Sequence, residues 1–263
     1  MENTDQLDLM LNALTEIIEE EKGKKASPQT PPEPVLPTLD RVLAGISPLP
    51  AEALFLGMAN DGLPVLLNLH DPVPGPILIA GNPSSGKTRL LQTIARGVEA
   101  LHDPEMAQYA IISKKPDEWK SFYKGKNNIG IYRSNEENTA ELIRSLVAWA
   151  HNNKGEGQSI ILFLDELNDI TKLDEQTRQN LRWLLLRGPS RRVWTFAVMN
   201  AEDAESMSGW LEFFRTRLFG FVNDADAGKM LTGNSPLNHL SPREEFAMRE
   251  GDQLLKFWLP SIG

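Results

Sequence analysis

Short apolar runs alternate along most of the chain with longer stretches in which apolar residues recur at helical spacing. The apolar runs that predict β-strands are residues 76–80, 107–113, 129–132, 159–167, 192–199, 216–222 and 253–259. The stretches that predict helices are residues 86–101, 136–152, 174–187 and 224–231. Strands that alternate with helices form a mostly parallel central sheet flanked by helices. The pattern therefore predicts an α/β fold.

A β-hairpin is predicted ahead of the first of these strands. Residues 53–58 and 63–69 are apolar runs, and Asn60, Asp61 and Gly62 between them are residues of a tight turn. We expect this hairpin to lie at an edge of the sheet or to form a lid.

The first 52 residues have a different pattern. Residues 5–22 place apolar side chains at helical spacing with acidic side chains on or near the other side, which predicts an amphipathic helix. Residues 23–52 are predicted to be a semi-extended linker, because seven of the 18 prolines lie between Pro28 and Pro50. The helix either docks on a partner or another subunit, or packs back on its own core. The expected domains are residues 1–22, 23–52 and 53–263.

Composition narrows the functional classes. The chain has 263 residues, no cysteine and four scattered histidines, so disulfides and thiolate metal sites are excluded and a histidine metal site is not expected. No apolar run approaches the length of a membrane span, and the start of the chain lacks a basic signal-peptide head. We therefore expect a cytoplasmic protein. The net charge of −9 argues against a broadly basic surface for nucleic acid but allows a local basic patch.

The sequence GNPSSGKT, residues 81–88, joins the strand predicted at 76–80 to the next predicted helix. It fits the P-loop pattern G-x-x-x-x-G-K-[ST], in which backbone N–H groups and a helix N-terminus surround phosphate oxygens. Lys87 is expected to reach the β- and γ-phosphates, and the Thr88 hydroxyl is expected to bind Mg²⁺. The predicted nucleotide-binding residues are Gly81, Asn82, Pro83, Ser84, Ser85, Gly86, Lys87, Thr88 and Arg89.

Two carboxylates, Asp165 and Glu166, follow the apolar run SIILFL. Such a run predicts a central parallel strand buried on both faces, and ligands of α/β folds bind at the carboxyl ends of these strands. We expect Asp165 to hold Mg²⁺ through its water shell and Glu166 to polarise the attacking water, as in ATP hydrolysis. The alternative, a charge pair at a helix N-terminus, is disfavoured by the P-loop upstream.

Two further features are candidates for the same chemistry. Asn200 ends the strand predicted at 192–199, where it would sense the γ-phosphate; otherwise it is a turn residue. Arg187, Arg191 and Arg192 lie in the loop before that strand and are candidates for an arginine finger that acts on a neighbouring subunit. The alternative for these arginines is a solvated turn.

The order of these motifs resembles the FtsK/HerA superfamily of motor ATPases. The stretch LGMANDGLPVLLNLHDPVPGPILIAGNPSSGKT is similar to the family's approach to the P-loop, and IILFLDELNDI resembles its second acidic motif. TRLFGFVNDADAGKMLTG followed by REGDQLLKF is similar to its closing strand, helix and G-D-x-L strand. The likeness covers about residues 54–258.

This resemblance implies a RecA-like P-loop core, a homohexameric ring, ATP sites between subunits, and double-stranded DNA in the central channel. Three departures affect these implications. Asn200 stands where the family usually has glutamine, and Gly188 is followed by Pro189 where an arginine finger is normal. Residues 171–178, TKLDEQTR, are less basic than the matching stretch of DNA pumps, which weakens the DNA assignment.

Two functional hypotheses follow. The first is a ring-forming ATPase that translocates DNA, with contacts from residues 114–126, where five lysines accompany Trp119, Phe122 and Tyr123. That stretch is equally compatible with an amphipathic surface helix. The second is a partner-coupled ATPase that acts on a protein substrate, which suits the acidic composition. An AAA+ ATPase is a weaker third hypothesis because the last segment looks like a strand, and the absence of an N-K-x-D motif argues against a GTPase.

Overall fold

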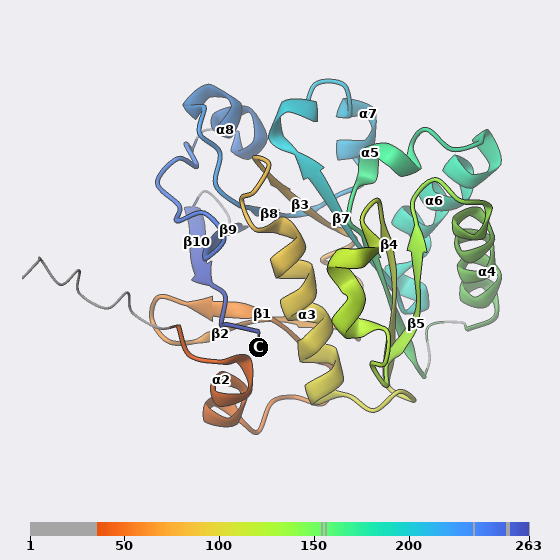
Figure 1. Cartoon of the computed structure of the whole chain (residues 1–263), viewed down its shortest axis with the longest axis horizontal. Helices are drawn as coiled ribbons and strands as arrows, with labels where there is room; N and C mark the ends of the chain where they lie inside the picture. The colour runs from red at the N-terminus through yellow and green to blue at the C-terminus, as the bar shows by residue number, and fades with distance from the viewer. Residues whose placement is uncertain (1–35, 154, 156, 234, 251–252, 263) are drawn as a thin grey trace, which may run out of the picture. The chain divides into compact units, whose positions relative to one another are not determined.

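A ten-stranded sheet carries the site, and Figure 1 shows its strands and the helices around them. The computed structural model describes residues 36–153, 155, 157–233, 235–250 and 253–262, and the helix predicted at residues 5–22 lies outside them. The strands are β1 (Ala53–Ala59), β2 (Pro64–Asn68), β3 (Ile77–Gly81), β4 (Ala107–Ser113), β5 (Asn128–Arg133), β6 (Ser159–Leu164), β7 (Val193–Asn200), β8 (Thr216–Phe219), β9 (Glu245–Glu250) and β10 (Gln253–Trp258).

The strand order is β2-β1-β10-β9-β8-β3-β7-β6-β4-β5. The portion from β8 to β5 is parallel, whereas β9, β10, β1 and β2 pair antiparallel to their neighbours. Because the parallel strands point the same way, their carboxyl ends meet at one edge of the sheet. The predicted α/β fold with a mostly parallel sheet is confirmed.

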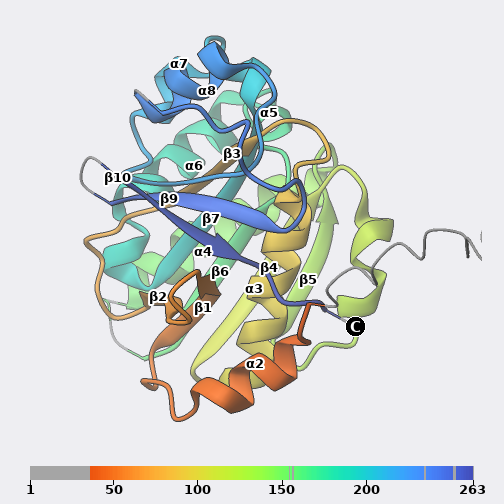
Figure 2. The same cartoon turned by 90° about the vertical axis from the view of Figure 1, so that its left-hand side faces the viewer.

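Helices cover both faces of the parallel strands. The helices are α2 (Leu39–Ile46), α3 (Lys87–Leu101), α4 (Glu137–Asn153), α5 (Leu167–Ile170), α6 (Glu175–Arg187), α7 (Ser208–Leu211) and α8 (Ala225–Thr232), with 3₁₀ turns η1 (Pro116–Phe122), η2 (Pro189–Arg191) and η3 (Ala201–Asp203). Figure 2 shows α3 on the opposite side of the strands from α4 and α6. Ile77 and Ile79 of β3 pack with α3, and Leu78 packs with α4 and α6, since strand side chains alternate between faces.

Local sequence explains where the helices begin. Asp174 caps α6 by accepting a hydrogen bond from the Thr177 N–H at 2.9 Å, and Asp224 caps α8 in the same way. Helix α3 has no side-chain cap, because its N-cap residue, Gly86, has no side chain; the φ of Gly86 is 97°, in the left-handed region. The first N–H groups of α3 therefore have no capping side chain, as expected of a phosphate site.

The hairpin prediction is confirmed: β1 and β2 pair antiparallel, and β2 forms one edge of the sheet. The predicted linker over 23–52 is wrong in its last part. Residues 39–46 form α2, and Leu39, Val42 and Leu43 are buried with Phe55 and Met58 of β1. The compact unit accordingly begins at Pro37. The many prolines between residues 28 and 50 led to the linker prediction, although the apolar residues of α2 are at helical spacing.

Two other differences concern the end of the chain. Strand β8 ends at Phe219, three residues before the predicted end, and the sequence reading missed β9 entirely. β9 has only three consecutive apolar residues, 246–248, between charged ones, which is a weak strand signal. Its strand conformation depends on pairing with both β10 and β8. Within the described residues, no helix is long and apolar enough to cross a membrane.

Candidate functional site

The loop between β3 and α3 carries the GNPSSGKT motif at the carboxyl edge of the sheet. Strand β3 ends at Gly81 and α3 begins at Lys87, as the motif requires. Two residues of the loop are left-handed, Ser84 with φ 64° and Gly86 with φ 97°. The loop is fixed to the neighbouring chain by the Asn82 N–H, which donates to the Phe221 carbonyl at 2.9 Å.

Lys87 is buried, with a relative exposure of 7%. Its ammonium donates to the carbonyl oxygens of Gly81 at 3.0 Å and Asn82 at 2.6 Å. Burial lowers the pKa of Lys87 to about 8, and the charges of Glu166 and Asp165 only partly oppose this effect. The side chain is thus folded back over the loop, in a position from which it can turn to phosphate oxygens.

Asp165 follows β6 and is the most extensively hydrogen-bonded side chain of the site. Its Oδ1 accepts the Thr88 hydroxyl at 2.8 Å, while its Oδ2 accepts the Ser113 hydroxyl at 3.0 Å and the Trp119 indole N–H at 3.1 Å. Burial raises the pKa of Asp165, and these three hydrogen bonds oppose the increase. The donors lock the carboxylate in one orientation beside the P-loop.

Glu166 and Asn200 lie at the same edge. Burial and the carboxylates of Asp169 and Asp203 raise the pKa of Glu166. Glu166 stands at the N-cap of α5, yet its side chain makes no capping hydrogen bond there, so a helix-capping role does not account for it. Asn200 ends β7 and is paired with Gly81 in the parallel register. The structure therefore brings together Lys87, Thr88, Asp165, Glu166 and Asn200.

Hard oxygen donors at this edge fit Mg²⁺. The described residues contain no group of three or more His, Cys, Asp or Glu side chains that could hold a metal ion. Mg²⁺ needs no such group, because it is commonly held by one or two carboxylates together with phosphate oxygens and waters. Thr88 and Asp165, with their oxygens 2.8 Å apart, would be the residues that hold it.

Trp119 and Ser113 belong to the site and were missed as site residues by the sequence reading. Ser113 ends β4 next to β6, so a polar residue at a strand carboxyl end was an available signal. Trp119 had no such signal, because η1 folds back over α3. Gln92 of α3 donates to the Glu118 carbonyl at 2.8 Å, and Arg96 of α3 lies 4.2 Å over the Phe122 ring.

The expectation that aromatics of residues 114–126 stack on bases is wrong for two of the three. Trp119 is fully buried and Phe122 is 1% exposed, and both rings pack in the core between η1, β4 and β6. Tyr123 alone is exposed, at 54%. The alternative expectation of a surface helix is closer to the structure, in the form of the 3₁₀ turn η1.

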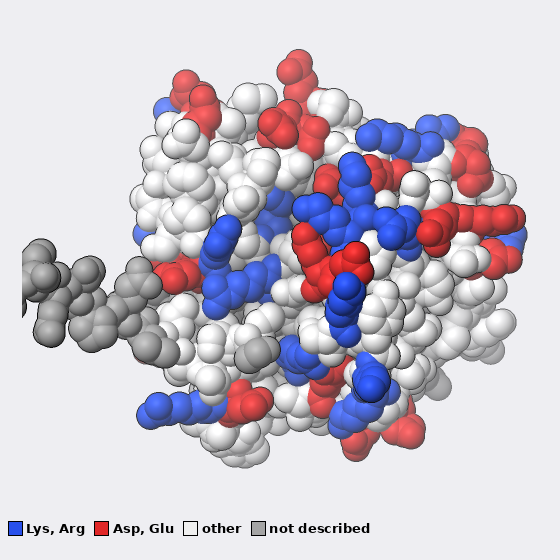
Figure 3. Space-filling model, in the orientation of Figure 1, with Lys and Arg blue, Asp and Glu red and all other residues white. Residues whose placement is uncertain are grey.

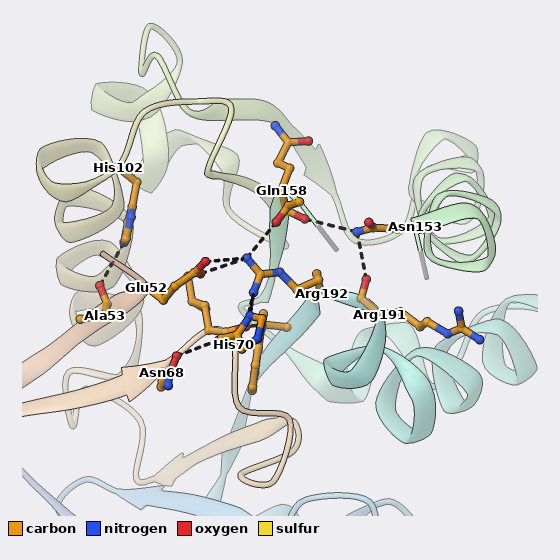
Figure 4. Close-up of polar contacts among 12 residues, drawn as sticks. Glu52, Ala53, Asn68, His70, His102, Asn153, Gln158, Arg191 and Arg192 are labelled. Carbon is orange, nitrogen blue, oxygen red and sulfur yellow. Dashed lines mark hydrogen bonds and ion pairs between the residues drawn. The ribbon is translucent and has the colours of Figure 1, made fainter. Parts of the chain in front are cut away.

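The three arginines of the loop before β7 have different surroundings. Arg187 is exposed and Arg191 is partly exposed. Arg192 is buried, and its guanidinium donates to the Glu52 carboxylate at 2.9 Å, the Gly157 carbonyl at 2.8 Å and the Leu69 carbonyl at 3.2 Å. Figure 4 shows Arg192 within this network and the Arg191 guanidinium directed away from it. Arg192 therefore ties β7 to the hairpin and is unsuited to reach a neighbouring subunit.

The Arg192→Ala variant is expected to lower the free energy of unfolding by about 2–4 kcal/mol, because it leaves the Glu52 carboxylate without its buried partner. Urea unfolding followed by circular dichroism measures this change. Arg187→Ala is the matched control, since an exposed arginine in the same loop contributes about 0.5 kcal/mol or less. Equal stability of the two variants would contradict the structural role of Arg192.

The sequence matches no family model and no curated protein. Solved structures do share its fold. EccC ATPases 2 and 3 from Thermomonospora curvata match with a TM-score of 0.69 and 17% identity, over 87% of this chain and 44% of theirs. EssC ATPases 2 and 3 from Geobacillus thermodenitrificans match with a TM-score of 0.69 and 14% identity, over 88% of this chain and 47% of theirs.

VirB4 of Thermoanaerobacter pseudethanolicus matches with a TM-score of 0.55 and 12% identity, over 81% of this chain and 98% of that one. The chain spans less than half the length of the EccC and EssC structures above. The EccC and EssC neighbours are ATPases by name, and the likeness shows that this chain shares their fold. The fold is therefore that of a P-loop ATPase domain.

Proposed function

We propose that this protein is an ATP-hydrolysing motor domain. The observation that carries the proposal is the hydrogen bond from the Thr88 hydroxyl to the Asp165 carboxylate at 2.8 Å. It joins the P-loop to the acidic motif, two features 77 residues apart in sequence, at one point of the sheet edge. A phosphate-binding loop beside a fixed carboxylate and a second, partly buried carboxylate is what phosphoryl transfer to water needs.

The residues have separate roles in this proposal. The backbone N–H groups of the P-loop bind the phosphates, and Lys87 exchanges its two carbonyl partners for β- and γ-phosphate oxygens. Thr88 and Asp165 would hold Mg²⁺, which supplies positive charge to the transferring phosphoryl group when bound. Glu166 orients the attacking water and accepts its proton. Asn200 senses the γ-phosphate through its side-chain amide.

The same proposal gives Arg187 and Arg191 a role between subunits. Both precede β7, so they lie at the opposite end of that strand from Asn200 and the P-loop. A head-to-tail interface brings opposite faces of neighbouring subunits together and generates a closed ring, here a hexamer. An arginine from this loop would then enter the site of the next subunit and stabilise charge on the phosphoryl group.

We propose a protein substrate for this motor in preference to DNA. Three of the five lysines of the 114–126 segment are paired with carboxylates: Lys115 with Glu118 at 3.2 Å, Lys120 with Asp117 at 3.0 Å and Lys126 with Asp103 at 3.5 Å. In Figure 3 acidic side chains accordingly lie among the basic ones. Paired lysines and buried aromatics make a poor DNA-tracking surface. One EccC structure of this fold is a complex with a signal sequence peptide.

The ATPase rate of the full chain, measured with and without duplex DNA at two salt concentrations, tests both parts. We expect Mg²⁺-dependent hydrolysis that duplex DNA leaves unchanged. Stimulation by DNA that weakens as salt rises would instead support DNA translocation, since phosphate contacts release counterions. Absence of hydrolysis under every condition, with Lys87→Ala indistinguishable from wild type, would overturn the ATPase proposal.

The pH dependence of nucleotide binding follows from the lowered pKa of Lys87, about 8. Below pH 8 the ammonium is already present, whereas above it the free protein must take up a proton before Lys87 can bind phosphate. ADP affinity is therefore expected to fall as pH rises above about 8, by at most about 10-fold per pH unit. Calorimetry in buffers of different ionisation enthalpy should detect proton uptake at pH 9 and little at pH 7. Equal uptake at both pH values would contradict the assignment.

Trp119 is expected to act as a positioning residue for Asp165. In Trp119→Phe the carboxylate loses the indole N–H donor, and the Mg²⁺ concentration that gives half-maximal hydrolysis should rise by about 10-fold. Hydrolysis over a range of free Mg²⁺ measures this shift, and ADP binding in EDTA should stay unchanged. The matched control is Trp149→Phe on α4, because the donors to the Asp165 carboxylate are Thr88, Ser113 and Trp119. A Mg²⁺ dependence identical in both variants would contradict the role.

A further inference from the structure

A loop from the end of the chain forms one wall of the P-loop. The Arg243 N–H donates to the Ser85 carbonyl at 3.0 Å, and the Arg243 carbonyl accepts a hydrogen bond from the Arg89 guanidinium at 3.2 Å. Gly86 is in even closer contact, because a Cβ there would lie 2.6 Å from the Arg243 Cα. Any side chain at position 86 would therefore push this loop away from the P-loop.

The backbone at Arg243 is unusual. Its φ is 69°, in the left-handed region that favours glycine, asparagine and aspartate over arginine. The side chain is exposed, and among the described residues it has no hydrogen-bond or ion-pair partner. An arginine that is held in a disfavoured conformation beside a ligand site, with its guanidinium free, points to a contact with the ligand.

Strand order decides which part of the ligand Arg243 faces. Asp165, Glu166 and Asn200 follow β6 and β7, on one side of β3, and they define the γ-phosphate end. Arg243 precedes β9, on the other side of β3 beyond β8. The nucleoside end of a nucleotide on this P-loop must lie away from the γ-phosphate, which is the side of Arg243.

Arg89 cannot readily take this role itself. Its guanidinium donates to the carbonyls of Arg243 and Pro260, at 3.2 Å and 3.4 Å. Arg89 thus holds the C-terminal loops against α3, although the sequence reading assigned it to the nucleotide. Arg243, in contrast, has a guanidinium without a hydrogen-bond or ion-pair partner among the described residues, next to this loop.

We propose that Arg243 stacks its guanidinium plane on the nucleoside of the bound nucleotide. Planar guanidinium groups stack well on aromatic rings, whereas a lysine ammonium supplies charge without a plane. This inference rests on the proposed nucleotide binding at the P-loop and adds a residue that recognises the nucleoside. Arg243 thereby makes the site selective for nucleotides over inorganic polyphosphates.

Binding of ADP and of inorganic pyrophosphate to the full chain tests the proposal, because ADP is pyrophosphate with a nucleoside esterified to it. Arg243→Gly is the sharpest variant, since glycine accepts a φ of 69° without strain. It is expected to weaken ADP binding by about 10-fold, the size of a desolvated cation–π contact, and to leave pyrophosphate binding within about two-fold. Arg243→Lys should also weaken ADP binding, although it keeps the charge.

Arg144→Gln, at an exposed position of α4, is the control and should bind both ligands like wild type. Unchanged ADP affinity in Arg243→Gly would overturn the inference, and so would an equal loss for ADP and pyrophosphate. Both outcomes leave the proposed function intact if ADP binding by the wild type still depends on Lys87. Absence of ADP binding by the wild type would instead overturn the proposed function.

Discussion

The Glu166→Gln variant is expected to bind ATP like the wild type and to hydrolyse it about 10²–10⁴-fold more slowly, the usual contribution of a general base. Glutamine has the shape of glutamate but cannot accept a proton from water. The raised pKa of Glu166 makes it a stronger base than an ordinary carboxylate, and the charges of Lys114 and Lys87 only partly oppose the increase.

Single-turnover hydrolysis and equilibrium binding of ATP separate these two effects. Because binding should persist without turnover, the variant is also expected to accumulate the ATP-bound form. Glu141→Gln makes the same chemical change on the exposed face of α4, where Glu141 pairs with Arg144 at 3.5 Å, and should hydrolyse ATP at the wild-type rate. Undiminished turnover in Glu166→Gln would remove Glu166 from the mechanism.

The Lys87→Ala variant is expected to lose ATP affinity by about 10²-fold or more, because a charge-assisted contact with phosphate is worth about 1.5–3 kcal/mol and the neighbouring carboxylates then repel the ligand unopposed. Two partial compensations limit the loss: the P-loop N–H groups remain, and so does the dipole of α3. Calorimetric titration with ADP gives the affinity without hydrolysis.

Folding must be separated from binding in this variant, since Lys87 is buried and bonded to Gly81 and Asn82. Removing a buried cation that burial disfavours should leave the thermal midpoint close to that of the wild type. Lys87→Met keeps the apolar stem and is a second variant with the same expected loss of affinity. ADP affinity that survives in both variants would contradict the role of Lys87.

The sequence reading predicted the fold class, which is confirmed, and the residues that the structure gathers at the candidate site, because their signals are local. Strands β4 and β7, helix α6 and the P-loop each have a hydrophobic period or a motif of their own. Asp165 and Glu166 were found because a central parallel strand is buried on both faces and leaves polar residues only at its end. Side-chain chemistry at Lys87, Thr88, Asp165 and Glu166 could thus be assigned from order along the chain.

Residues that join the site from distant segments could not be predicted in this way. Trp119 reads as an exposed aromatic among lysines, yet it is fully buried and donates to Asp165. Arg192 reads as one of three equivalent arginines, yet Glu52, 140 residues away in sequence, binds it in the interior. Arg243 lies in a loop without a motif, and only the pairing of β9 with β8 brings that loop beside β3.

The amino-acid sequence by itself therefore determined most of the helices and strands and predicted the phosphate chemistry, because hydrophobic periodicity and the P-loop motif extend over a few consecutive residues. Only the tertiary structure showed that Arg192 is paired in the interior, that Trp119 donates to the Asp165 carboxylate, and that the loop of Arg243 lies against the P-loop. These properties depend on burial and on partners between 46 and 158 positions away, such as Trp119 for Asp165 and Ser85 for Arg243. A guanidinium in the interior must be paired, whereas the same group at the sheet edge is available to a ligand.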